Sequence, residues 1–409
     1  MQYRIDKKSG AKLSVLGLGC MRFPRNPALI DMKKTERIIM TAVENGVNYF
    51  DTAWMYPGSE EALGTVLERN GVRDNVFIAS KLPIALVKKA EDFDRFFNEE
   101  LSRLKTDRID YYLMHMLTDA ASWKHLAALG IEDWIAGKKK NGSIGRTGFS
   151  FHGIGEEFFK ILEMYPWEFC QIQYNYSDEN FQAGVKGLKK AAETMPVIIM
   201  EPLLGGKLAG GLPRKAADIF KAANLSAGIP ADRLGSRPAG FSPAGWGLRW
   251  VWNQAEAAVV LSGMNDPAQV LENAALADIT LPGSLGAAEL DVYRQVREVF
   301  NASYRIHCTG CGYCMPCPRN VNIPGCFAAY NTSFSMGRVA GWQQYMTSAA
   351  FTSAQSFGPA NCVACGNCER RCPQKIPIVE NLKTLRRRME PLPFRIAVAG
   401  MRKFLGRKP

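Results

Sequence analysis

Short apolar runs alternate with amphipathic segments through the first two thirds of the chain. Segments with apolar residues three or four positions apart cover 34–45, 93–104 and 158–164 and predict helices. The runs between them are short and almost continuously apolar, which is typical of buried parallel strands. Eight such runs occur, at 13–20, 47–51, 76–81, 109–115, 144–150, 169–173, 197–201 and 258–263.

Eight strands alternating with helices predict an α/β fold, a closed (β/α)8 barrel of the TIM-barrel type. The alternative is a doubly wound sheet, which usually carries a GxGxxG turn after its first strand. Residues 17–22 (GLGCMR) do not complete that pattern. The Gly-, Ala- and Pro-rich segment 209–243 predicts a long loop with a helix at the C-terminal face of the barrel, where active sites lie.

The Leu281-Pro282-Gly283 turn marks a domain boundary. The sequence therefore predicts a barrel over 1–282 and a small, mainly α-helical domain over 283–390. The second domain contains cysteine runs at 308–317 and 362–372, whose spacing is typical of a ferredoxin-like iron–sulfur domain. A basic amphipathic tail follows over 391–409. For this tail we favour packing onto the barrel over docking of a redox partner protein, and both over contact with anionic membrane lipid.

The net charge of +12 is concentrated at the C-terminus. Residues 383–409 carry nine Lys/Arg and one acid, so the rest of the chain carries only +4. That distribution gives no reason to expect a nucleic-acid partner. The 47% of hydrophobic residues suits a folded core, and the N-terminus lacks the pattern of a signal peptide. We therefore expect a cytoplasmic protein; its oligomeric state is not predicted.

Nine of the eleven cysteines lie between residues 308 and 372, most of them three positions apart. This spacing suits several thiolates converging on one metal cluster better than it suits disulfides. The run Cys-x2-Cys-x2-Cys-x3-Cys-Pro at 362–373 is that of bacterial ferredoxins, whereas zinc sites usually separate two CxxC pairs by a loop. The copy at 308–318 is one residue short before its fourth cysteine. We predict two [4Fe–4S] clusters, with the ligands Cys308, Cys311, Cys314, Cys317, Cys362, Cys365, Cys368 and Cys372.

In two-cluster ferredoxins the fourth cysteine of each run binds the other cluster. By this rule Cys372 completes the first cluster and Cys317 completes the second. Because of the missing residue, Cys326 is an alternative to Cys317. Cys20 and Cys170 stand alone in apolar stretches; they and Cys326 are predicted to be core or loop residues.

The barrel region carries several motifs in a fixed order. They are NYFDTAWMYPGSE at 48–60, IASK at 78–81, DYYLMH at 110–115, GRTGFS at 145–150, QIQYN at 171–175, EPLLGG at 201–206 and SGMNDP at 262–267, with Glu272 and Asn273 beyond. Together they resemble the aldo/keto reductase family over roughly residues 1–280. The whole chain is similar to the subgroup of that family that is fused to a ferredoxin-type domain.

The resemblance implies a catalytic set of Asp51, Tyr56, Lys81 and His115. Carbonyl reduction needs a proton at the developing alkoxide, which Tyr56 would donate. A free tyrosine titrates near 10, so Lys81 would favour the phenolate, and Asp51 would keep Lys81 charged. His115 would orient the substrate oxygen.

The family also implies NAD(P)H as the hydride donor. Ser150 and Gln171 match the positions that hold the nicotinamide carboxamide, Met200 replaces a stacking aromatic residue, and Gly205 borders the pyrophosphate. Gly263 and Gln269 stand where many members have a Lys and an Arg for the 2′-phosphate, so the choice between NADH and NADPH stays open. Gln269, Glu272 and Asn273 would bind the adenosine by hydrogen bonds.

Three functions are compatible with these features. The favoured one is an iron–sulfur oxidoreductase that acts on a small carbonyl or alcohol substrate, with clusters that exchange electrons with a partner. In the second, the barrel only binds or senses the nucleotide and the clusters alone are redox-active. In the third, the clusters are structural. We expect Met21, Arg22, Trp54, Met55 and Trp246 to line a partly apolar pocket that also accepts an anionic group.

Overall fold

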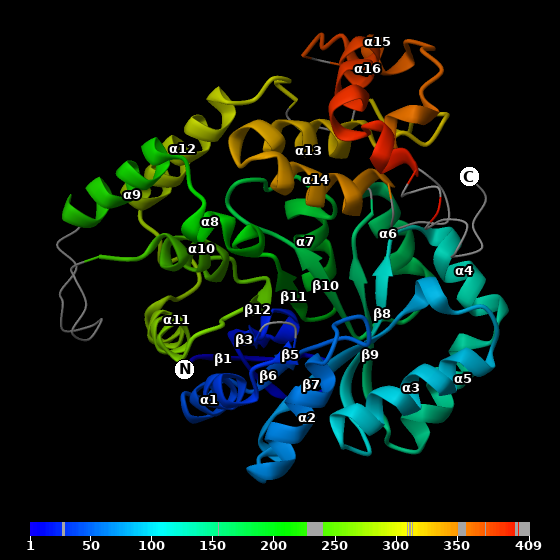
Figure 1. Cartoon of the computed structure of the whole chain (residues 1–409), viewed down its shortest axis with the longest axis vertical. Helices are drawn as coiled ribbons and strands as arrows, with labels where there is room; N and C mark the ends of the chain where they lie inside the picture. The colour runs from blue at the N-terminus through cyan, green and yellow to red at the C-terminus, as the bar shows by residue number, and fades with distance from the viewer. Residues whose placement is uncertain are drawn as a thin grey trace.

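Eight parallel strands form a closed barrel (Figure 1). The computed structural model describes the chain except residues 27–28, 154, 227–239, 309, 311, 313, 351–356, 373, 397–399 and 401–409. Around the barrel the order is β10-β11-β12-β3-β6-β7-β8-β9, and every pairing is parallel, which confirms the predicted fold. The strands are β3 (Leu16–Gly19), β6 (Tyr49–Asp51), β7 (Phe77–Leu82), β8 (Ile109–Leu117), β9 (Ile144–Phe151), β10 (Phe169–Gln173), β11 (Val197–Met200) and β12 (Ala257–Ser262).

The apolar run at 13–20, predicted as one strand, is divided. Its start belongs to β2 (Lys12–Ser14), which pairs antiparallel with β1 (Tyr3–Ile5), and Cys20 already begins the 3-10 helix η1 (Cys20–Arg22). Leu13 is fully buried in the same core as Tyr111, whose hydroxyl donates to Asp6 Oδ2 at 3.0 Å. The hairpin therefore packs against the inside of the barrel at the N-terminal end of its strands. The first part of the run is apolar because it is buried in this hairpin, and the second part because it forms the barrel strand β3.

An outer layer of helices covers the barrel. Their apolar faces, such as Ile38 and Ile39 of α1 and Phe96 and Phe97 of α3, are buried in one large core with the outward side chains of the strands. The layer consists of α1 (Met32–Glu44), α2 (Ser59–Arg69), α3 (Glu91–Leu104), α4 (Ala120–Ala128), α5 (Ile131–Lys140), α6 (Gly155–Met164), α7 (Gly184–Ala192), α10 (Pro243–Trp252) and α11 (Pro267–Ile279).

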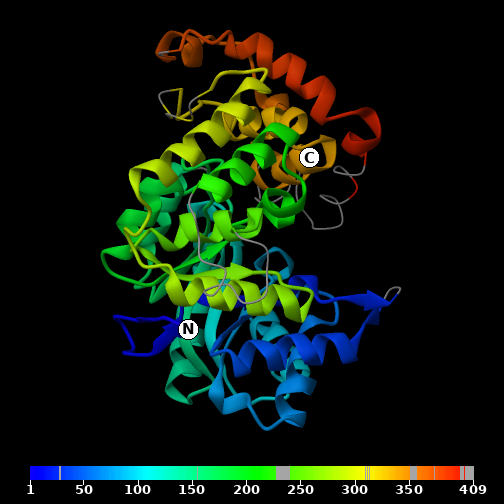
Figure 2. The ribbon, with the colours of Figure 1, turned by 90° about the vertical axis from the view of Figure 1, so that its left-hand side faces the viewer.

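The predicted excursion after β11 contains η4 (Leu204–Gly206), α8 (Lys207–Gly210) and α9 (Arg214–Ser226); residues 227–239 lie outside the described part. Helix α9 packs beside α12 (Ala287–Ala302), as Figure 2 shows. The apolar face of α12 is buried in the core of the barrel rather than among the cysteines. Trp246 is 1% exposed in that core and stacks on Phe220 at 5.2 Å between ring centroids, so the expectation that it lines an open pocket is wrong.

A second core holds the cysteine-rich region, which is mainly helical as predicted. Its helices are α13 (Ile323–Ser335), α14 (Arg338–Tyr345), the π-helical turn η6 (Met346–Ala350), the 3-10 helix η7 (Pro359–Asn361), α15 (Asn367–Arg371) and α16 (Ile378–Met389). Of the predicted tail, Phe394 packs on Trp342 at 5.1 Å between ring centroids, whereas 397–399 and 401–409 lie outside the described residues. In the described residues no helix combines the length and apolar character needed to cross a membrane.

Candidate functional site

The four residues of the predicted catalytic set gather at the C-terminal end of the barrel. Asp51 ends β6, Lys81 is the last residue but one of β7, and His115 lies near the end of β8. Tyr56 lies in the turn between β6 and α2, where its backbone N–H donates to Ala53 O at 2.9 Å. Because parallel strands end at the same face, neighbouring strands bring these side chains together.

Lys81 is the centre of this group. Its Nζ donates to Asp51 Oδ1 at 2.7 Å and to Thr52 O at 2.6 Å. The same Nζ lies 5.0 Å from the centroid of the Tyr56 ring. The rings of Tyr56 and His115 meet edge to face, with centroids 5.8 Å apart and planes at 86°. The structure thus joins all four side chains through direct contacts.

The charges at this site follow from burial and from the ion pair. Burial by itself lowers the pKa of Lys81, but the Asp51 carboxylate and Tyr56 raise it, and the net pKa lies above its ordinary value. Lys81 is therefore a permanent cation near neutral pH. Burial, Lys81 and His152 together hold the pKa of His115 well below its usual range, so this imidazole is neutral.

Tyr56 differs from the sequence-based expectation in one respect. Burial raises the pKa of its phenol, and the opposing effect of Lys81 is smaller, so the net shift is upward. The phenol therefore holds its proton in this state of the protein. A proton donor is what carbonyl reduction requires, and Lys81 makes that donor more acidic than burial alone would allow.

Two predicted nicotinamide ligands lie beside the catalytic set. The Nε2 of Gln171 donates to Asp51 Oδ2 at 3.3 Å, while its Oε1 is buried and accepts no hydrogen bond from the described residues. An unpartnered buried amide oxygen costs about 1–3 kcal/mol, which a ligand N–H could offset. Ser150 Oγ accepts from the backbone N–H of Met116 at 2.8 Å. These groups fit a carboxamide, and the side chain of Met200 lies half-buried at the end of the next strand.

Gly205 and Gly263 share one neighbour, Arg22. A Cβ at Gly205, where φ is +64°, would lie 2.6 Å from an Arg22 guanidinium nitrogen, and one at Gly263 would lie 3.2 Å from Arg22 Cδ. The exposed side chain of Arg22 thus extends across the mouth, and no described residue forms a hydrogen bond or ion pair with it. The pocket predicted from the sequence included this arginine, and both glycines leave room for it.

The predicted adenosine ligands lie near the start of α11. Gln269 Oε1 accepts from the backbone N–H of Asn265 at 3.0 Å, and the side chain of Glu272 is half-buried. Asn273 is 4% exposed, and its Nδ2 donates to Ser262 Oγ at 3.2 Å. Asn273 therefore anchors α11 to the end of β12, and nucleotide binding by these three residues stays a prediction.

His152 is a site residue that the sequence did not reveal. It follows the end of β9, two positions after Ser150, and is 9% exposed. Its Nδ1 lies 3.5 Å from Gln182 Nε2. Burial and Lys81 lower the pKa of His152 to about 4, so a second neutral imidazole stands near His115. Its position just after a barrel strand was the one available signal.

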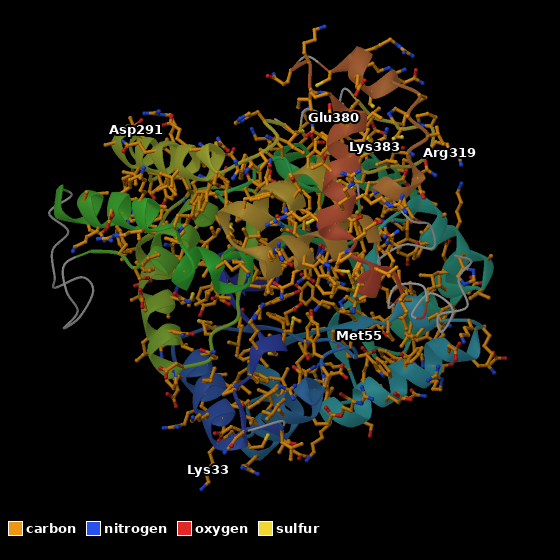
Figure 3. All side chains as sticks on the ribbon, turned by 45° about the horizontal axis from the view of Figure 1, so that its top comes forward. Lys33, Met55, Asp291, Arg319, Glu380 and Lys383 are labelled. Atoms are coloured by element: carbon orange, nitrogen blue, oxygen red, sulfur yellow. The ribbon has the colours of Figure 1, made fainter. Side chains whose placement is uncertain are left out.

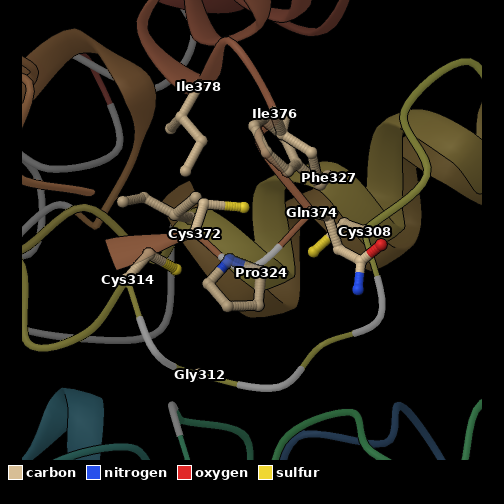
Figure 4. Close-up of a pocket in the computed structure, with 10 residues that line it drawn as sticks. Cys308, Gly312, Cys314, Pro324, Phe327, Cys372, Gln374, Ile376 and Ile378 are labelled. Carbon is tan, nitrogen blue, oxygen red and sulfur yellow. The ribbon is translucent and has the colours of Figure 1, made fainter. Parts of the chain in front are cut away.

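The cysteines of the second domain line two cavities. Cys308, Cys314 and Cys372 share the first, and in Figure 4 their sulfur atoms turn toward the same space. Its walls are otherwise mainly apolar, with Ile323 and Phe327 among them. A pocket lined by thiols and apolar side chains fits a cluster held by thiolates. Cys311 lies outside the described residues.

Cys317, Cys362, Cys365 and Cys368 line the second cavity, together with Cys314. Of the described cysteines, Cys372 therefore lies with Cys308 and Cys314, and Cys317 lies with the first three of the other run, as the ferredoxin rule predicts. Cys326 lines neither cavity; it is fully buried, and its Sγ faces Phe357 O at 3.9 Å. Cys20 and Cys170 are fully buried in the core of the barrel, as expected.

The loop between β10 and α7 connects the two sites. Glu179 forms an ion pair with Arg297 of α12, and a Cβ at Gly310 would lie 3.4 Å from Asn180 Cβ. Gln182 of the same loop contacts His152. Because this loop follows the C-terminal end of a strand, the first cysteine cavity lies on the side of the barrel where the catalytic set lies.

Comparison with known proteins gives two family matches. A model of the aldo/keto reductase family matches residues 15–284, and a 4Fe-4S dicluster domain model matches residues 307–376. The aldo-keto reductase YhdN of Bacillus subtilis is 27% identical over 306 residues, which are 68% of this chain and 89% of that protein.

Solved structures show the same fold. An aldo-keto reductase from Klebsiella pneumoniae in complex with NADPH has a TM-score of 0.55 and 23% identity, covering 73% of this chain and 96% of the other. The holo form of an aldo-keto reductase from Bacillus halodurans has the same TM-score and identity, with coverages of 72% and 96%.

Proposed function

The chain belongs to the aldo/keto reductase family, and from that premise we propose that its barrel interconverts a small carbonyl substrate and its alcohol with NAD(P)(H). We further propose that the cysteine-rich domain holds two [4Fe–4S] clusters that transfer electrons. The observation that carries the first part is Lys81, a buried cation that is hydrogen-bonded to Asp51 and lies near the Tyr56 ring, which also meets the neutral His115 edge to face.

In reduction, Tyr56 would give its proton to the oxygen of the substrate. As that proton leaves, the phenolate is stabilised by the Lys81 ammonium, which Asp51 holds in place. His115 stays uncharged, so it would orient the substrate oxygen by a hydrogen bond without competing as the acid. In the reverse direction, the phenolate would take the proton of the alcohol.

Bound NAD(P)H would supply the hydride. The unpartnered oxygen of Gln171 and the hydroxyl of Ser150 are suited to its carboxamide, and Met200 to packing on its ring. The guanidinium of Arg22, which reaches Gly205 and Gly263 and opposes the burial-driven rise in the pKa of Glu201, offers a cation for the phosphates. Preference for NADH or NADPH is not assigned.

The clusters would supply one-electron transfer. Cys308, Cys311, Cys314 and Cys372 are the proposed ligands of the first, and Cys317, Cys362, Cys365 and Cys368 those of the second. The two cavities, each with thiols from both runs, support this assignment. A redox partner protein and a cytoplasmic location remain part of the proposal.

Substitution Tyr56→Phe tests the reductase. Because it removes only the proposed proton donor, we expect carbonyl reduction to fall by about 10²–10⁴-fold. Nicotinamide binding, followed by fluorescence titration, and iron content should not change. The control is Tyr3→Phe, which removes an exposed hydroxyl bonded to Gly46 O far along the chain. Turnover near the wild-type rate in Tyr56→Phe would exclude this mechanism.

A further inference from the structure

The two cysteine cavities lie at different places in the molecule. The first lies beside the barrel, where Gly310 meets Asn180, and its Cys372 is buried. The second lies at the start of α15, at the outer end of the molecule (Figures 1 and 2). There Cys365 is exposed and Val363 is 57% exposed. A redox centre in the second cavity would therefore have an exposed cysteine beside it, which an approaching molecule can contact.

Basic side chains surround this opening. Arg319 lines the cavity, Lys383 follows the lining residue Leu382, and a guanidinium nitrogen of Arg370 lies 3.5 Å from the Cβ position of the lining Gly366. Arg319 and Lys383 project outward in Figure 3. We call the exposed residues at this opening the distal face; they are Arg319, Val363, Cys365, Arg370, Arg371 and Lys383.

These cations are not neutralised within the part of the chain that the structure describes. No ion pair there involves Arg319, Arg371 or Lys383. Two acids lie nearby: Glu369 accepts a hydrogen bond from the backbone N–H of Val379 at 2.8 Å, and Glu380 is exposed. The distal face thus combines an exposed apolar side chain and a thiol with an excess of positive charge.

We propose that the distal face docks an acidic protein electron carrier. The inference rests on the proposed function, because it takes the second cavity to hold a cluster. Complementary charge steers such encounters and accelerates association. Electron-transfer complexes bury little surface, often less than about 1,200 Å², so docking does not need a large apolar patch. Val363, exposed beside the second cavity, supplies the apolar contact that such interfaces contain.

The experiment measures binding of the anaerobically purified holoprotein to an acidic flavodoxin as probe. The test variant reverses three charges of the distal face: Arg319→Glu, Arg371→Glu and Lys383→Glu. The affinity should fall by at least about tenfold, and its dependence on salt should become weaker, since screening acts on exposed charges. Normal iron content in the variant establishes that the domain is folded. If the triple variant does not fold, Lys383→Glu alone is tested, because Lys383 lies on α16 outside the cysteine runs.

A matched control reverses three exposed cations of the barrel, Lys8, Lys33 and Arg37, to Glu. Lys33 lies at the opposite end of the molecule from the distal face (Figure 3). The control changes the net charge by the same amount, so its affinity for flavodoxin should stay close to that of the wild type. Equal losses in the two variants would mean that net charge alone drives binding, and would overturn the proposal.

Two other outcomes would also overturn it. If the distal variant binds flavodoxin normally but shifts the reduction potential of the clusters, the cations serve only to offset the charge of a cluster. If it binds flavodoxin normally but no longer binds vesicles containing phosphatidylserine, the face is a membrane contact. If the wild-type protein is purified without iron, the proposed function is contradicted. This result differs from the outcomes above, in which the clusters are present and only the docking proposal fails.

Discussion

Replacing Cys317 and Cys326 in turn by serine tests which thiol completes the second cluster. Cys317 lines the second cavity with Cys362, Cys365 and Cys368, whereas Cys326 is fully buried against Phe357 O and lines neither cavity. Two complete clusters hold about eight iron atoms per chain. Cys317→Ser should therefore leave about four, because the first cavity keeps its own thiols.

Cys326→Ser should behave differently, because it acts on packing rather than on ligation. Burial raises the pKa of the Cys326 thiol, and its Sγ faces Phe357 O rather than either cavity. A buried hydroxyl in its place has Phe357 O as an acceptor, and we expect a destabilisation of about 1–3 kcal/mol at most. The iron content should stay near eight.

The assay is iron and acid-labile sulfide per chain after anaerobic purification, with the visible spectrum as a second measure. Thermal unfolding of both variants separates ligand loss from destabilisation. If Cys326→Ser loses half of the iron and Cys317→Ser loses none, the one-residue deletion has moved ligation to Cys326 and the geometric reasoning is refuted.

Two further predictions concern the barrel. The pKa of His152 in the folded protein, about 4, lies below its ordinary value near 6.5, so stability is fully present above pH 6.5 and is lost as pH falls toward 4, by about 3 kcal/mol at most. His152→Gln should reduce this acid sensitivity, measured as melting temperature against pH, and leave the part that the buried His115 contributes; an unchanged profile would contradict it. Because the first cavity lies on the catalytic side of the barrel, NAD(P)H, alone or with substrate, should reduce the clusters under anaerobic conditions and give an electron paramagnetic resonance signal. Each of the two clusters would take one of the two electrons that the nicotinamide gives up together with a proton. No signal, together with full reductase activity after cluster loss, would assign the clusters to structure or to an external donor.

Part of the site was predictable because it depends on strand ends. A residue that closes a barrel strand must lie at the common mouth, so Asp51, Lys81 and His115 could be placed from the alternation of apolar runs alone. The division of the run at 13–20 could not be predicted from the sequence, because a barrel strand and a hairpin that packs inside the barrel bury apolar residues equally well. Trp246 was misplaced for the same reason: an aromatic residue on a helix near the mouth suits either a pocket or a core.

The sequence by itself determined the barrel, its catalytic set and the two cysteine runs, because each is written in spacings between residues that are close along the chain. The tertiary structure decided what depends on approach between distant residues. It brought Cys372 to the first run and Cys317 to the second, and it excluded Cys326 from both cavities. It also left Gln171 Oε1 buried with no hydrogen-bond partner among the described residues, and set His152 beside His115. Such distances follow from how the layers pack, and packing is a property of the whole folded chain.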